Sequence, residues 1–276
     1  MEKQENIRTN KGKLLIISGF IIIAILFLIY ARSSSLELTP EAIPVLERVA
    51  VVFYIILILS IVAISFGLYK YHNQKVFENK EGLLSIIATV TLNKKSRRIF
   101  ILTFIGYGVF FSLTSGMLVY QPEVVFSHHY NAEIPSAHIT PCCGDPGYMP
   151  KIIVYLTEHI GLQIVPINLV LQIIVSYLVG LNTALAVSAF TFFKRGSGFG
   201  GIGATTGLFI ACPTCVGAFS SIFIGSASAI AFTFAITQMQ TLFILITIPV
   251  LLTAPFIIAK KLRTQAKNCE TNSKRE

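Results

Sequence analysis

Charged residues are scarce in this chain, and tryptophan is absent. Only 13% of its 276 residues are Asp, Glu, Lys or Arg, whereas a soluble globular domain carries about 25%. No charged residue occurs between Gly196 and Ala259. This scarcity excludes an ordinary soluble domain, and the 54% share of hydrophobic residues excludes a disordered chain. The composition therefore predicts a protein that resides in a lipid bilayer.

Several catalytic signatures are also missing. The sequence has no GxxxxGK[ST] motif, which argues against a nucleotide partner, and no HExxH zinc-protease motif. No Asp or Glu falls inside any stretch that is apolar and long enough to cross a membrane. This absence argues against a proton relay built on carboxylates.

Six stretches are apolar and long enough to cross a hydrocarbon core about 30 Å thick, which takes roughly 20 helical residues. They are Leu14–Ala31, Ala50–Leu68, Phe100–Tyr120, Ile167–Phe193, Ile202–Ala235 and Leu242–Ala259. Their continuous apolar runs favour helices over the alternating strands of a membrane barrel. The sequence predicts an all-α, multi-pass bundle of six transmembrane helices that forms a single membrane domain.

The basic residues predict the orientation of this bundle. Nineteen of the 22 Lys and Arg residues lie in the N-terminal tail, in the loop 69–98, just after the fourth stretch or in the C-terminal tail. The positive-inside rule places these segments, and both termini, in the cytoplasm of a cell-membrane protein, with the loop 121–151 outside. The net charge of +9 then reflects topology and anionic lipid, so no nucleic-acid partner is needed to explain it.

Two apolar segments are too short to cross. We expect Gly82–Leu92, inside the basic loop, to form a helix at the membrane interface. We expect Ile152–Pro166 to lie along the outer surface, with Glu158 and His159 at its polar side.

The predicted external loop is rich in metal-ligating side chains and contains no basic residue between Phe126 and Met149. Its candidate ligands are His128, His129, His138, Cys142 and Cys143. Imidazole and thiolate together suit copper and zinc. The alternative is a plain polar loop with a structural disulfide, which is common outside the cell.

A second cysteine pair, Cys212 and Cys215, lies inside the fifth stretch with Pro213 between them. That stretch has 34 residues, which would make a straight helix roughly 51 Å long, so we expect one crossing built from broken helices with Cys212 near the midplane. A CxxC pair serves dithiol exchange or soft-metal binding. The alternative is two small buried thiols beside a helix kink.

The segment from Pro141 to Gly217 resembles a group of archaeal-type polytopic membrane proteins with an external Cys-Cys loop and an intramembrane CPTC motif. The resemblance rests on Cys142-Cys143-Gly144, Tyr155-Leu-Thr-Glu-His159, Val179-Gly-Leu-Asn182 and Ala211-Cys-Pro-Thr-Cys215, and it implies a shared architecture without an activity. The Cys212-Pro-Thr-Cys215 motif is also similar to that of membrane thiol-transfer proteins. This chain departs from them because its other cysteine pair is vicinal and external.

Three functions remain open from the sequence. The first is binding or transfer of copper or zinc, with the external His/Cys loop capturing the ion, from a metal carrier or from solution, and Cys212/Cys215 receiving it. The second is a membrane thiol-disulfide oxidoreductase, in which Cys212 and Cys215 would be the catalytic pair. The third is a non-catalytic subunit of a membrane complex that uses the external loop as a docking surface.

Overall fold

The computed structural model describes residues 2–33, 43–78, 82–141, 147–193, 248–260 and 263–264. The chain divides into two compact units. The first unit comprises Met1–Tyr71 and Ser115–Gln172, and the second comprises His72–Thr114 and Ile173–Glu276.

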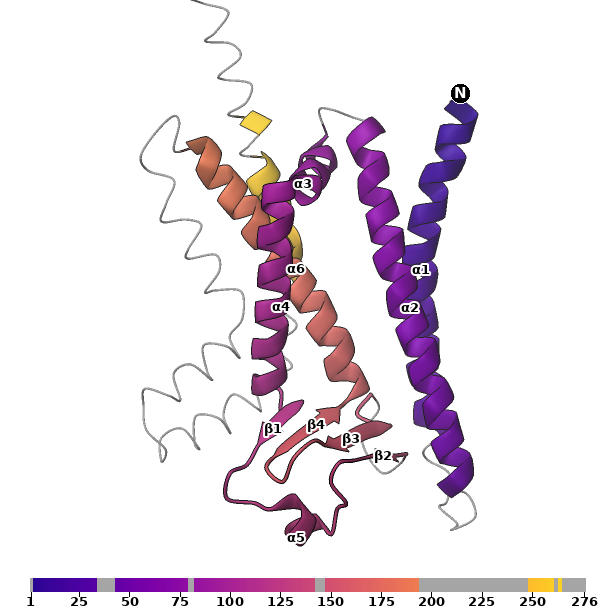
Figure 1. Ribbon diagram of the computed structural model, residues 1–276. Coiled ribbons are helices and arrows are strands. Elements are labelled where there is room, and N and C mark those ends of the chain that lie inside the picture. Colours follow the sequence, from indigo (N-terminus) through magenta and orange to yellow (C-terminus); the bar gives the residue numbers. More distant parts are fainter. Residues whose placement is uncertain are drawn as a thin grey trace, which may run out of the picture. The chain divides into compact units, whose positions relative to one another are not determined.

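The structure is mostly helical, as the sequence predicts. Its long helices are α1 (Glu2–Ser33), α2 (Ile43–Glu78), α4 (Lys94–Thr114) and α6 (Pro166–Phe193) (Figure 1). Each contains a segment that is long and apolar enough to span a membrane: Lys11–Arg32, Ile43–Val76, Lys94–Leu113 and Pro166–Ala189. These helices correspond to the first four predicted crossings.

The structure describes only a part of the last two predicted crossings. The stretch 202–235, with Cys212 and Cys215, lies outside the described residues. Of the stretch 242–259, the structure describes the part from residue 248 onward, where a helix runs from Ile248 to Lys260. This described helix is shorter than the roughly 20 residues that a crossing requires.

The third predicted crossing, Phe100–Tyr120, is wrong at its C-terminal end. Helix α4 stops at Thr114, and Gly116 follows with a φ of 71°. This left-handed conformation is one that glycine adopts without steric cost, and it commonly ends a helix. Leu118–Tyr120 then forms strand β1 instead of a last helical turn.

The expectation of an all-α fold needs a second correction, because the first unit contains a small sheet. Strands β1, β2 (Ser136–Thr140), β3 (Lys151–Tyr155) and β4 (Ile160–Ile164) pair in the order β1-β4-β3-β2, and all three pairings are antiparallel. Most of the segment 152–166 therefore belongs to a hairpin, formed by β3 and β4, and its last residue, Pro166, begins α6. The turn of the hairpin is closed by backbone hydrogen bonds from the N–H groups of Leu156 and Thr157 to the carbonyl of Ile160.

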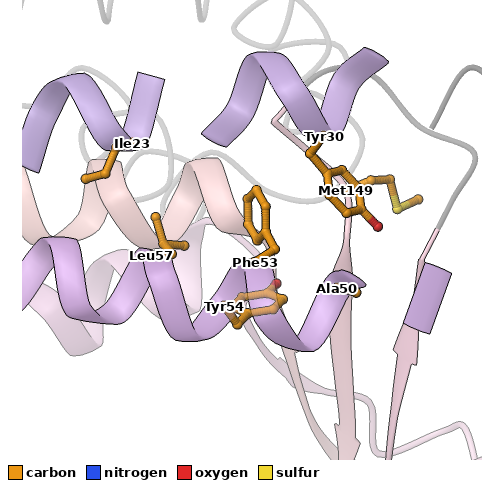
Figure 2. Close-up of a cluster of buried hydrophobic side chains, with 7 residues drawn as sticks. All are labelled: Ile23, Tyr30, Ala50, Phe53, Tyr54, Leu57 and Met149. Carbon is orange, nitrogen blue, oxygen red and sulfur yellow. The ribbon is translucent and has the colours of Figure 1, made fainter. Parts of the chain in front are cut away.

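The core of the first unit lies between α1, α2 and the sheet. Phe53 and Leu57 of α2 are fully buried and pack with Ile23 and Tyr30 of α1 and with Met149 (Figure 2). Isoleucines from β2, β3 and β4 pack against this cluster. Tight ring contacts continue through it, with edge-on centroid distances of 5.7 Å for Phe27–Phe53 and 5.0 Å for Tyr30–Phe53. The two helices and the sheet thus share one hydrophobic core.

Glycines let α1 and α2 approach closely. A Cβ added to Gly67 would lie 3.0 Å from Ile16 Cγ1 and 3.1 Å from the carbonyl oxygen of Gly12. A Cβ on Gly12 would in turn lie 3.4 Å from the carbonyl oxygen of Gly67. Small residues that face each other in this way are the usual means of close helix packing in lipid.

The second unit contains α4, most of α6, the Ile248–Lys260 helix and a short helix, α3 (Leu83–Leu92). Helix α3 thus covers the segment predicted to be helical, with Gly82 as its N-cap. Ile87 of α3, Leu181 and Leu185 of α6 and Ala259 of the last helix form one buried cluster. The amide nitrogen of Asn182 donates to the carbonyl of Leu251 at 3.0 Å, which adds a polar contact between α6 and the last helix.

Candidate functional site

The predicted external ligands divide into described and undescribed residues. Cys142 and Cys143, like Cys212 and Cys215, lie outside the described residues. His128 and His129 lie on a five-residue helix, α5 (Phe126–Tyr130), and His138 lies on β2. The candidate site is therefore built from the sheet and the α5 segment.

Helix α5 is held by its first two residues. Phe126 is buried, packs on Tyr155 of β3 at a centroid distance of 5.3 Å, and donates its backbone N–H to the carbonyl of Glu158. The hydroxyl of Ser127 donates to Glu158 Oε2 at 2.7 Å, and its backbone N–H lies 3.2 Å from the same oxygen. Glu158 thus fixes the start of α5 from the β3–β4 turn.

The same contacts lower the pKa of the Glu158 carboxyl. The main cause is the hydrogen bond from the Ser127 hydroxyl, followed by that from the Ser127 backbone N–H, with a smaller contribution from His159. Hydrogen bonds donated to a carboxylate favour its charged form. Glu158 is therefore an ionised structural acceptor at neutral pH.

His159 also has a structural role. Its Nδ1 lies 3.2 Å from the carbonyl of Gln121 and 3.0 Å from that of Val124. Both partners are acceptors, so the tautomer that fits carries the proton on Nδ1 and donates it. Together with the bond from the Gln121 N–H to the His159 carbonyl, this side chain ties the segment before α5 to the β3–β4 turn.

The three histidines predicted as ligands are placed differently. His128, His129 and His138 are all exposed. Within the described part of the chain, their ring nitrogens have no hydrogen-bond partner. These three imidazoles are thus open to solvent, whereas that of His159 is engaged with the backbone.

Two of these imidazoles flank a pair of stacked tyrosines. The ring of His129 meets Tyr130 edge-on at 4.8 Å, Tyr130 stacks on Tyr155 at 6.2 Å, and His138 lies 5.6 Å from Tyr155. We call His129, Tyr130, Tyr155 and His138 the aromatic row. It brings α5, β2 and β3 to one surface.

The described residues do not form a complete metal centre. Among them, no group of three or more His, Cys, Asp or Glu side chains is close enough to hold an ion. His129 and His138 both belong to the aromatic row, but no third potential ligand among the described residues lies close enough to complete a site with them. A site that uses these histidines would need donors from outside the described residues.

Two tyrosines that the sequence did not single out hold the chain on either side of the Cys142–Cys143 segment. The hydroxyl of Tyr30 in α1 donates to the carbonyl of Pro141, the residue before Cys142. The hydroxyl of Tyr54 in α2 lies 2.7 Å from the carbonyl of Pro150 and 2.9 Å from that of Ile164. The available signal was a hydroxyl-bearing ring within a strongly apolar stretch of helix, because a buried Tyr hydroxyl usually has a partner.

Comparisons with known proteins identify no relative of this chain. No protein-family model, curated protein or solved structure matches it.

Proposed function

We propose that this chain is an integral membrane protein that binds a soft metal ion, copper or zinc, through its external His/Cys loop and transfers it to Cys212 and Cys215. The observation that supports this proposal best is the accessibility of His128, His129 and His138, all exposed and without ring hydrogen-bond partners among the described residues. Neutral imidazole with a free nitrogen is a ligand of both metals. The orientation follows the Lys and Arg distribution.

The anchoring of Pro141 supports a contribution from the vicinal cysteines. Cys142 follows His138 by four residues, so even a fully extended chain keeps the two within roughly 14 Å. Tyr30 holds Pro141 at the end of this connection. The length of the chain thus allows these cysteines to reach one of the open imidazoles, and thiolate with imidazole favours Cu(I) and Zn over hard cations.

The test measures metal stoichiometry on the full-length chain in mild detergent. The protein is loaded with Cu(I) or Zn²⁺, dialysed against a weak chelator and examined by elemental analysis together with a count of free thiols. We expect about two ions per chain, one at the external ligands and one at Cys212 and Cys215, and a loss of the external ion in His128→Ala/His129→Ala/His138→Ala and in Cys142→Ser/Cys143→Ser. His72→Ala is the matched control, because this histidine lies on α2 and should leave the bound metal unchanged.

The cysteines of the fifth predicted crossing test the transfer step. In Cys212→Ser/Cys215→Ser, we expect the external ion to bind and a second, intramembrane ion to be lost. Stoichiometric metal that survives removal of all the external ligands and both of these cysteines would refute the proposal. A metal-free protein whose thiols titrate as a dithiol at a defined potential would support thiol exchange instead, and a metal-free protein with stoichiometric partners would support a subunit role.

A further inference from the structure

Exposed basic side chains gather at one end of the second unit. Ser96 of α4 is buried and hydrogen-bonded to Ser188 near the end of α6, at 2.9 Å between hydroxyl oxygens. Ala259, at the end of the last helix, packs with Ile87 of α3 and Leu185 of α6. The start of α4, the end of α6 and α3 therefore lie together (Figure 1). The exposed cations at this end are Lys94, Lys95, Arg97, Arg98 and Lys260.

The chain supplies few anions to neutralise this end. No Asp or Glu occurs between Glu81 and Glu123, or between Glu158 and Glu270. None of the four cations of α4 has an ion-pair partner among the residues that the structure describes. Cations in the first turn of a helix also oppose its dipole, so helix stability does not explain this cluster. These observations point to an anion from outside the chain.

Helix α3, which lies beside these cations, has the features of a helix in contact with lipid. Residues 82–93 contain no charge, and Leu84 of α3 is exposed. The hydroxyls of Thr89 and Thr91 donate to carbonyls one turn earlier in the same helix, at 2.8 Å to Ser85 and 2.8 Å to Ala88. Polar groups satisfied within their own helix are compatible with a lipid environment, where no water is present to pair with them.

A single residue, Asn93, joins this uncharged helix to the basic turn. Its N–H donates to the carbonyl of Thr89 in α3, and its carbonyl accepts from the N–H of Arg97 in α4. The side-chain oxygen of Asn93 also accepts from the N–H of Lys95 at 3.3 Å. The uncharged helix α3 and the four cations of α4 are therefore separated only by Asn93, whose hydrogen bonds hold the two helices together at this point. Such a change from uncharged to basic residues matches the boundary between hydrocarbon and headgroups.

We propose that α3 and the basic turn Lys94–Arg98 form a binding surface for anionic phospholipid headgroups, with α3 in the interface and the four cations at phosphate depth. A lipid fits better than a nucleic acid or an acidic protein, because α4 continues directly from this turn as a candidate membrane span, Lys94–Leu113. Lys and Arg next to a crossing helix attract anionic lipid. This proposal is independent of the metal-binding function.

The absence of tryptophan makes a site-specific test possible. In Leu84→Trp, the one indole of the chain reports on lipid that is next to α3. The full-length variant is titrated in mild detergent with brominated phosphatidylglycerol or brominated phosphatidylcholine, both of which quench indole fluorescence on contact. We expect at least a tenfold tighter apparent affinity for phosphatidylglycerol, equivalent to about 1.4 kcal/mol. High salt should reduce this preference, because a Debye length of about 3 Å at 1 M screens exposed charges.

Two charge-neutralised variants locate the effect. Changing Lys94, Lys95, Arg97 and Arg98 to Gln in the Leu84→Trp background should reduce the preference to less than about twofold. The matched control changes the same number of cations to Gln in the N-terminal tail: Lys3, Arg8, Lys11 and Lys13. It should keep the tenfold preference. Equal quenching by both lipids in the parent, or an equal loss in both variants, would overturn the proposal.

Two further measurements complete the test. Millimolar inorganic phosphate should leave the lipid quenching unchanged, and full displacement by phosphate would instead indicate a site for free phosphate and overturn the lipid assignment. Native mass spectrometry of the chain without an introduced Trp provides a readout that does not depend on Leu84→Trp folding correctly. The parent should retain phosphatidylglycerol and the quadruple Gln variant should lose it, and equal retention by both would contradict the proposal.

Discussion

Removing the hydroxyl of Tyr54 should destabilise the first unit by more than the loss of an ordinary contact in a membrane protein. In Tyr54→Phe, the carbonyls of Pro150 and Ile164 lose a donor that now lies 2.7 and 2.9 Å away. Pro150 is fully buried, so water does not replace that donor. A hydrogen bond between transmembrane helices averages about 0.6 kcal/mol, but a buried acceptor left unsatisfied costs about 1–3 kcal/mol. We therefore expect a loss of about 2 kcal/mol.

Thermal unfolding of the full-length chain in mild detergent, followed by circular dichroism, measures this loss. For a chain of this size we expect the midpoint to fall by about 5 °C. Tyr69→Phe is the matched control, because it removes the same atom from the same helix at a ring that is 59% exposed. Its midpoint should shift by less than about 1 °C. Equal midpoints for the two variants would refute the reasoning that the Tyr54 hydroxyl holds the sheet to α2.

Tyr30→Phe extends this prediction. Tyr30 is buried and holds Pro141, while Tyr54 holds Pro150 on the other side of the same segment. Because both hydroxyls restrain one stretch of chain, the double variant should lose less stability than the sum of the single losses. Strict additivity would show that the two bonds act on independent parts of the unit.

Two other variants test the packing and the electrostatics of the described fold. Gly67→Leu should destabilise the α1–α2 pair by about 1–3 kcal/mol, because its Cβ would already contact the opposite helix. Gly106→Leu has open space around its Cβ and should be neutral in the same unfolding assay. Similar unfolding midpoints for the two variants would contradict the close packing of α1 on α2. Ser127→Ala should raise the pKa of Glu158 toward its ordinary value, because the main hydrogen bond that lowers it is lost. A carboxyl whose pKa is lowered by folding stabilises the fold above its ordinary pKa and loses this effect as the pH falls through the lowered value. The midpoint of Ser127→Ala should thus lie below that of the wild type at pH 7 and approach it in acid, and a gap that stays constant below about pH 4 would contradict the role given to this carboxylate.

Hydropathy predicted the long helices because an apolar run of sufficient length has one stable form in lipid. It did not predict where they end. Helix α2 runs from Ile43 to Glu78, well beyond the predicted Ala50–Leu68, because the helix continues through the charged residues, such as Arg48 and Lys70, that bound the uncharged run. Conversely, the apolar residues Leu118–Tyr120 extended the third prediction past Gly116, whose left-handed backbone ends the helical region.

The sheet was missed because its strands do not show the pattern that identifies a strand from sequence. All five residues of β3 are partly buried, so apolar and polar positions do not alternate along it. A short continuous apolar run is ambiguous between strand and helix by periodicity alone. The pairing of β1 with β4 joins residues about 40 positions apart, such as Leu118 and Leu162, and no local signal reports such a contact.

The candidate site depends on the same kind of distant contact. The sequence predicts His138 as a ligand of the His/Cys loop and places His159 at the polar side of the segment 152–166, but it does not show that the imidazole of His159 contacts the carbonyls of Gln121 and Val124. The structure engages Glu158 and His159 in holding α5 to the sheet, and it leaves His128, His129 and His138 exposed. Because the side chains of Glu158 and His159 already have hydrogen-bond partners within the fold, substitutions of these two residues should change stability. Substitutions at the three exposed histidines should act through binding with little effect on stability, and this difference separates a ligand from a structural residue.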